Sequence, residues 1–181
     1  MRTVPSLRTV PIVAEIARTF SRGCSRPGFR LVHYSLQGNH AHLIVEARDQ
    51  VALACGMKAI GARLARAVNR VAKRTGPVLA ERYHHRLLPT PTEVRNALRY
   101  VLLNAQHHAK EVAGKVAKQV RFDPASSARW FDGWKLGNRT VPNTSERSAA
   151  ASSPPVARAR TWLLATGWRR LGLLDPAAAP A

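Results

Sequence analysis

Two histidines, His40 and His42, flank a single alanine in an alternating stretch of the sequence. In a β-strand, residues i and i+2 point to the same side with Cα atoms roughly 6.6 Å apart, so two imidazoles at this spacing can converge on one metal ion. Glu46 would lie further along the same face. The pattern is short, and two half-buried polar residues on a sheet face would also produce it.

A helix predicted over residues 90–108 can supply a third ligand and a nucleophile. At about 100° per residue, Tyr100, Asn104 and His107 share one flank of this helix, beside its apolar stripe. If the stripe packs on the sheet, a tyrosine hydroxyl and an amide oxygen one turn apart can approach the strand histidines, and His107 is a candidate general base. Tyr100 can instead be an amphipathic residue at the edge of the core, and Asn104 a solvated helix residue.

The first helix and the strands are predicted from hydrophobic periodicity. Apolar residues at i, i+4 and i+8 indicate a helix over residues 11–22, and glycine and proline over 23–28 indicate a loop. Two alternating stretches, 29–37 and 40–46, predict an antiparallel pair of strands joined near Gly38. We expect one apolar face on each strand, formed by Val32, Tyr34 and Leu36 and by Ala41, Leu43 and Val45.

The longest predicted helix covers residues 51–74, with an apolar stripe of Leu53, Met57, Ile60, Leu64, Val68 and Val71. Residues 78–88 have the pattern of one or two short strands. The residues from Thr90 to Glu93 form a capping box that opens the helix over 90–108. Residues 138–160, rich in Ser, Pro, Ala and Arg, predict a flexible linker. Residues 161–174 predict one short helix anchored by Trp162 and Trp168.

The 181-residue chain carries a net charge of +19, which indicates a polyanionic partner, nucleic acid rather than a membrane surface. A basic stripe beside the apolar stripe of the helix over 51–74 is a candidate for contacts with DNA phosphates, or a solvated face. Its members are Arg63, Arg66, Arg70, Lys73 and Arg74. Four more candidates for DNA contacts flank the chemical residues: Arg82, Arg86, Arg95 and Arg99. Trp130 and Trp134 can stack on bases or anchor a C-terminal segment to the core.

Several classes of protein are disfavoured by the sequence. No stretch approaches the roughly 18 apolar residues of a transmembrane helix, and no apolar region follows the first arginines as in a secretory signal. Cys24 and Cys55 are too far apart for a Cys-x-x-Cys motif and too few for a disulfide scaffold. We therefore expect a cytoplasmic protein in a reducing environment, without a membrane partner.

Three segments together, HYSLQGNHAHLIVEA (33–47), ERYHHRLL (81–88) and RYVLLNAQHHA (99–109), resemble the single-tyrosine HUH transposases of small insertion sequences and the related REP-associated tyrosine transposases. The match is carried by His40 and His42 on a strand and by Tyr100 followed four residues later by Asn104. It covers roughly residues 5–110.

The resemblance implies a fold and a boundary. Residues 1–122 would form an α+β domain with an antiparallel sheet of ferredoxin-like or RRM-like type and packed helices, followed by a basic tail over 123–181. Members of the family begin with a strand before the first helix. We expect the sheet to lack this strand unless the protein starts upstream of Met1. A missing strand would leave an unpaired edge and an inactive enzyme.

The activity implied by the resemblance is that of a metal-dependent transposase or nickase for single-stranded or hairpin DNA, associated with the bacterial nucleoid and either monomeric or homodimeric. Mg²⁺ or Mn²⁺ bound by His40, His42 and Asn104 would polarise a phosphate oxygen, and Tyr100 would form a 5′-phosphotyrosine link. The imidazoles alone would equally accept Zn²⁺ or Ni²⁺. One alternative is a decayed or domesticated relative that binds DNA hairpins without cutting them. Another is an RNA-binding protein that stacks a base on an aromatic such as Tyr34.

Overall fold

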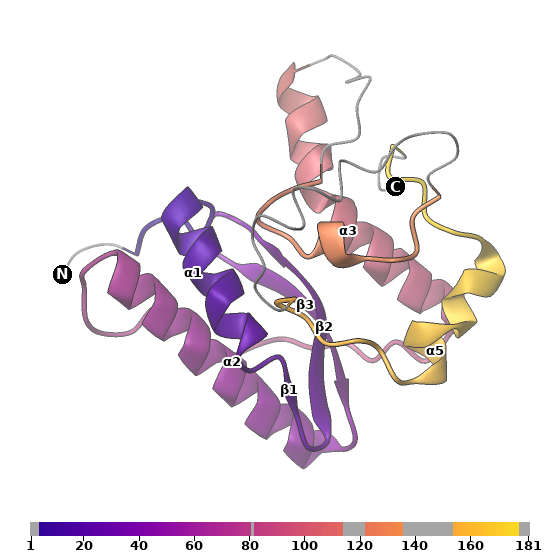
Figure 1. Cartoon of the computed structure of the whole chain (residues 1–181), viewed down its shortest axis with the longest axis horizontal. Helices are drawn as coiled ribbons and strands as arrows, with labels where there is room; N and C mark the ends of the chain where they lie inside the picture. Colours follow the sequence, from indigo (N-terminus) through magenta and orange to yellow (C-terminus); the bar gives the residue numbers. More distant parts are fainter. Residues whose placement is uncertain (1–3, 81, 114–121, 136–153, 178–181) are drawn as a thin grey trace.

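Three layers make up the computed structural model, which describes residues 4–80, 82–113, 122–135 and 154–177, with 105–113 described by their backbone (Figure 1). The middle layer is an antiparallel sheet in the order β1 (Ser25–Arg26), β2 (Phe29–Leu36) and β3 (Ala41–Ala47). Helices α1 (Val10–Ser21) and α2 (Gln50–Val71) cover one face. Helix α3 (Pro91–Ala113) covers the other face together with C-terminal segments. The predicted α+β class with an antiparallel sheet is confirmed, and three strands are consistent with a ferredoxin-like sheet that lacks one.

The hairpin of β2 and β3 closes tightly, because the amide of Gln37 donates to the carbonyl of His40 over 2.8 Å. The predicted faces of β3 are confirmed: Ala41, Leu43 and Val45 pack toward α1 and α2, and Ile44 packs toward α3. The predicted face of β2 is wrong at Val32, which lies on the α3 side. A β-bulge between Leu31 and His33 inserts one residue and reverses the alternation there.

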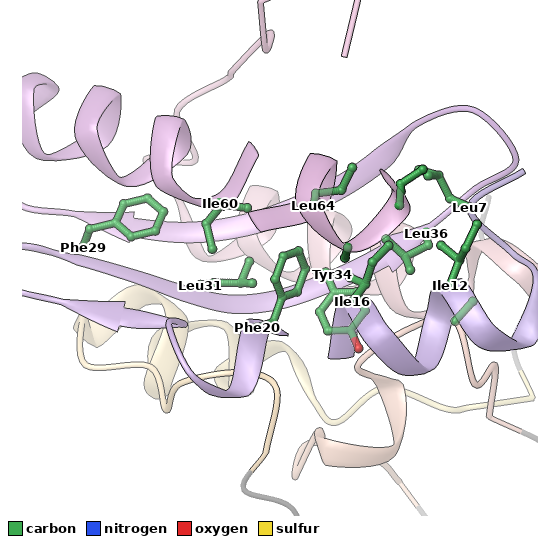
Figure 2. Close-up of a cluster of buried hydrophobic side chains, with 13 residues drawn as sticks. Leu7, Ile12, Ile16, Phe20, Phe29, Leu31, Tyr34, Leu36, Ile60 and Leu64 are labelled. Carbon is green, nitrogen blue, oxygen red and sulfur yellow. The ribbon is translucent and has the colours of Figure 1, made fainter. Parts of the chain in front are cut away.

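The first core lies between the sheet and the two N-terminal helices, and Figure 2 shows its side chains. Phe20 and Tyr34 meet edge to face with centroids 5.4 Å apart. Tyr34 is only 2% exposed, so it is not placed to stack a base. The predicted stripe of α2 contributes to this core along its whole length. Asp49 caps α2 by accepting from the amide of Ala52, and the helix ends three residues before the predicted Arg74.

The second core includes residues that follow position 122. Trp134, Leu164, Trp168 and Leu174 are buried with the apolar side of α3. Trp134 therefore anchors a C-terminal segment, as one of its two predicted roles required. The single helix predicted over 161–174 is instead two short ones, α5 (Trp162–Ala165) and the 3₁₀ helix η2 (Gly167–Leu171). Trp168 is fully buried, whereas the second predicted anchor, Trp162, is 51% exposed.

The C-terminal segments also form backbone hydrogen bonds along the side of β2 that faces away from β3. The amide of Leu36 donates to Ala125, and the amide of Ala157 donates to Leu31, each over 2.8 Å. A 3₁₀ helix, η1 (Ala128–Trp130), follows the first of these contacts. Residues 138–153 of the predicted linker lie outside the described residues, and residues 154–160 are described. Val156 and Ala157 lie against the sheet, because the amide of Ala157 donates to Leu31 and Val156 packs on the first core.

The strands predicted within 78–88 are wrong for the residues described there. This segment has no regular secondary structure and its large side chains, Leu79, Tyr83 and Leu87, are exposed. A strand needs a paired neighbour as well as the right residue types, and the description shows none for this segment. Within the described ranges, β3 also has no strand on the side away from β2.

Candidate active site at the start of β3

The two predicted histidines meet at one point. His40 stands directly before β3 and His42 is its second residue, and their Nε2 atoms are 3.1 Å apart. Ligand atoms in neighbouring positions of an octahedral ion with bonds of about 2.1 Å are themselves about 3 Å apart. The two nitrogens therefore have a separation that fits one shared divalent ion.

Tyr100 on α3 lies against the same pair. Its hydroxyl is 3.4 Å from Nε2 of His42, and the two rings meet nearly edge to face with centroids 5.0 Å apart. Tyr100 is 48% exposed, so a substrate can reach its side chain. Helix α3 reaches this position because its apolar side packs on Val32 and Ile44, which turns the flank of Tyr100 toward β3.

The surroundings of both imidazoles favour a state that can bind a metal. Asn39 Oδ1 lies 2.8 Å from Nδ1 of His40 and can accept a hydrogen bond from an Nδ1–H group, which leaves Nε2 with a free lone pair. Burial lowers the pKa of His42, and the nearby His40 lowers it further. His42 is therefore neutral at physiological pH, the state required for binding a metal or accepting a proton.

The two remaining candidates on α3 have different outcomes. Asn104 is one turn beyond Tyr100 and is buried, with 7% of its surface exposed, and no hydrogen bond joins it to His40 or His42 among the described residues. The side chain of His107 lies outside the described residues. Among the residues described, no group of three or more His, Cys, Asp or Glu side chains is arranged to hold a metal. A metal at His40 and His42 would therefore take its other ligands from amide oxygens, water or substrate.

A groove of about 1120 Å³ surrounds the site and runs between β3, residues 82–88 and α3. We call it the His–Tyr groove. Three of the four predicted flanking arginines, Arg82, Arg86 and Arg99, line it. Arg95 does not, because its side chain donates to the carbonyl of Gly172. The groove is thus an open channel beside Tyr100 whose lining includes three arginines and two carboxylates, those of Glu46 and Glu93.

The basic stripe of α2 lies elsewhere. Arg63, Arg66 and Arg70 line a separate cleft with α1, in the layer on the opposite face of the sheet. Arg74 is bonded to Asn69 and to the carbonyl of Pro77, and Lys73 follows the end of α2. The three arginines of the stripe that line this cleft therefore lie on the other face of the sheet from Tyr100.

Several hydrogen bonds and ring contacts of the site were not predicted from the sequence. Asn39 orients His40, and its position next to the histidine was the only available signal. Tyr83 and His85 form an exposed aromatic pair with centroids 5.9 Å apart in the lining of the groove. Glu46 is a buried carboxylate that accepts hydrogen bonds from Arg30 and Thr161, so it supports β3 and does not reach the histidines.

None of the helices in the described ranges combines the length and apolar composition needed to cross a bilayer. Comparisons with models of known protein families, with curated proteins and with solved structures return no match.

Proposed function

We propose that the protein cleaves and rejoins single-stranded DNA through a covalent link to Tyr100, as a metal-dependent single-tyrosine transposase or nickase of the HUH type. The observation that carries the proposal is the cluster of three groups at the start of β3. Two imidazole nitrogens lie 3.1 Å apart, and a tyrosine hydroxyl lies 3.4 Å from one of them. An exposed tyrosine beside two convergent imidazoles is the set of groups that this reaction requires.

The chemistry follows from these side chains. The oxygen of Tyr100 attacks the phosphorus of a phosphodiester, a bond from phosphorus to this oxygen forms, and the bond to the 3′ oxygen breaks. The phenol proton goes to solvent, and the leaving 3′ oxygen takes up a proton to become a hydroxyl. Mg²⁺ or Mn²⁺ held by His40 and His42 would supply polarisation of a non-bridging phosphate oxygen. Reversal of the same step by another 3′ hydroxyl rejoins the strand.

The His–Tyr groove favours a single strand as substrate. Arg82 and Arg86 are exposed in its lining. Arg82 can contact phosphates, whereas Arg86 pairs with Glu93 at 2.7 Å. The exposed rings of Tyr83 and His85 offer flat surfaces for stacking of unpaired bases. Bases in a duplex are already stacked on one another, so this combination is useful only for an unpaired strand.

A second candidate function is binding of DNA hairpins without cleavage. It is favoured by the free side of β3 within the described ranges, and no hydrogen bond joins Asn104 to either histidine among the described residues. In that case the same groove would bind the strand, and Tyr100 would not react.

The decisive experiment is incubation of the purified protein with labelled single-stranded hairpin DNA and Mg²⁺ or Mn²⁺, followed by denaturing electrophoresis. We expect an SDS-resistant adduct that Tyr100→Phe abolishes while DNA binding changes little. Tyr83→Phe is the matched control, because this exposed tyrosine has no histidine nitrogen within reach of its hydroxyl in the described structure, and it should leave the adduct in place. An adduct that persists in Tyr100→Phe contradicts the nucleophile assignment. Salt-dependent binding without an adduct under either metal supports the binding protein instead.

A further inference from the structure

A second concentration of positive charge lies between α1 and α2, on the opposite side of the sheet from Tyr100. Figure 1 shows the two helices side by side in this layer. Five arginines line a cleft of about 160 Å³ between them. The cleft, here called the arginine cleft, is lined by Arg18 and Arg22 from the end of α1 and by Arg63, Arg66 and Arg70 from α2.

One carboxylate faces these five cations among the described residues. Glu15 bonds to Arg18 at 2.6 Å and also pairs with Arg70. These interactions pair two of the five arginines with one carboxylate and leave the cleft with an excess of positive charge. Arg22, Arg63 and Arg66 have no carboxylate partner in the part of the chain that the structure describes. Like charges gathered in one concavity repel each other, and an anion between them removes that cost.

The guanidinium of Arg63 occupies space that only a glycine at position 23 leaves open. A Cβ on Gly23 would lie 2.3 Å from the Cζ of Arg63, so the guanidinium lies directly against the backbone at the end of α1. Two arginines in the last turns of a helix are enough to complement its dipole. Arg63 and Arg66 from α2 also line the cleft without a carboxylate partner among the described residues, so an anion there would meet two guanidinium groups that no carboxylate pairs.

The size of the cleft limits the ligand. A volume of about 160 Å³ has room for roughly five water molecules at about 30 Å³ each. Pockets for nucleosides and other drug-sized molecules start at roughly 300 Å³. Guanidinium groups bind phosphate oxygens with paired, parallel hydrogen bonds. The geometry points to a binding site for a phosphate or diphosphate group in the arginine cleft, separate from the His–Tyr groove and independent of the proposed cleavage activity.

Calorimetric titration with inorganic pyrophosphate, without divalent metal, tests this site. The wild-type protein should bind one equivalent with saturation. Arg63→Gln combined with Arg66→Gln should weaken binding by at least about tenfold, since two guanidinium groups that can donate paired hydrogen bonds are removed. Replacing both residues by lysine keeps the charge and removes the forks, and should give a smaller loss. Tyr100→Phe should leave the affinity for pyrophosphate unchanged, because the sheet separates the two sites.

The matched control removes the same charge elsewhere. Arg26→Gln combined with Arg158→Gln changes two exposed arginines outside the cleft and should weaken binding by less than about twofold. An equal loss in the control and the cleft variant, or no saturation in the wild type, would overturn the proposal, because binding would then reflect net charge. Thermal unfolding of each variant verifies that it is folded.

Competition identifies where the phosphate comes from. If a duplex oligonucleotide displaces pyrophosphate from the wild type, and the displacement is lost in the Arg63 and Arg66 variant, the cleft receives a backbone phosphate. If pyrophosphate stays bound in the presence of excess duplex, the cleft receives a free oxyanion. Either result retains the phosphate site, and only the two outcomes named above reject it.

Discussion

The buried imidazole of His33 makes a specific prediction about acid stability. His33 lies at the bulge of β2, is 7% exposed, and has its Nδ1 3.2 Å from the hydroxyl of Ser127. Its ring meets Phe131 edge to face at 5.3 Å. Burial lowers the pKa of His33 from 6.5 to about 4, and the charge of Asp132 opposes this only in part. The native state therefore keeps this imidazole neutral, whereas the unfolded chain binds its proton near pH 6.5.

This difference in pKa between the native and unfolded states fixes the sign and size of the change in the free energy of unfolding with pH. Since the unfolded state takes up the proton first, the contribution of neutral His33 to stability is fully present above pH 6.5 and is lost as the pH falls toward 4. At roughly 1.36 kcal/mol per pH unit, His33 alone should reduce the free energy of unfolding by about 3 kcal/mol between pH 7 and pH 4. Urea unfolding followed by tryptophan fluorescence measures this quantity, because Trp134 and Trp168 are buried close to Phe131.

His33→Asn keeps a polar side chain near Ser127 and cannot titrate in this range. Its free energy of unfolding at pH 7 should be lower than that of the wild type, but the difference should shrink by about 3 kcal/mol by pH 4. Comparison with the wild type removes the contributions of all other groups, including the lowered pKa of His42. His85→Gln, in an exposed loop, controls for the loss of one imidazole. Parallel curves for the wild type and His33→Asn would refute the assignment of a buried neutral imidazole.

Three further predictions concern stability. Burial alone would raise the pKa of Glu46, but hydrogen bonds from Thr161, Arg30 and Arg160 hold it below its ordinary value. Its stabilisation is thus present at neutral pH and lost as the pH falls through the lowered pKa, and Glu46→Gln should cost about 2–4 kcal/mol in urea unfolding at pH 7, with faster hydrogen exchange near Thr161. Gly56→Ala should cost about 1–3 kcal/mol, because the new Cβ would lie 2.1 Å from the ring of Phe29. Gly61→Ala, on the same helix, meets only the flexible end of Leu79 and should show no such loss in the same thermal melt. Lys73 has a left-handed φ of 47° after the end of α2, so Lys73→Gly should raise the free energy of unfolding by about 0.5–1 kcal/mol, whereas an unchanged or lower value would argue against strain there.

Strong periodicity was sufficient to predict the elements that carry the cores. The stripe of α2 steps by three and four over its whole length, and all its predicted members pack in the first core. The alternation of β3 is regular and its two faces are confirmed. The face of Val32 could not be predicted in this way, because a bulge is one inserted residue without a distinct composition.

The position of the C-terminal segments depended on contacts between residues far apart in the sequence. Residues 154–160 contain the proline, alanine and arginine typical of linkers, but Ala157 donates to Leu31 and the amide of Arg160 donates to Glu46. Composition reports the properties of a segment alone and contains no information about a partner more than a hundred residues away. The same reason explains Asp123, whose carboxylate forms a two-bond ion pair with Arg8 at 2.9 Å.

The candidate site was predictable where its residues are local. The spacing of His40 and His42 predicted that both imidazoles point to one side, and their nitrogens do lie within 3.1 Å. The approach of Tyr100 required the additional assumption that α3 packs its apolar stripe on the sheet, which the second core satisfies. The place of the α2 arginines could not be derived from helical phase alone, since the phase gives a direction around α2 but not the face of the sheet that α2 covers.

Strand β3 connects the site to the C-terminal segments. His42 is near its beginning, and Glu46 near its end receives hydrogen bonds from the amides of Arg160 and Thr161. β3 has no further strand beside it in the described ranges, so these bonds, together with β2, restrain a strand that would otherwise have a free side. The distance from His40 and His42 to Tyr100 depends on the position of α3 relative to β3. Leu164 and Trp168 pack on α3 and help to fix that position. The described residues from 154 to 177 therefore contribute to the geometry of the site from two directions, although none of them is a candidate for its chemistry.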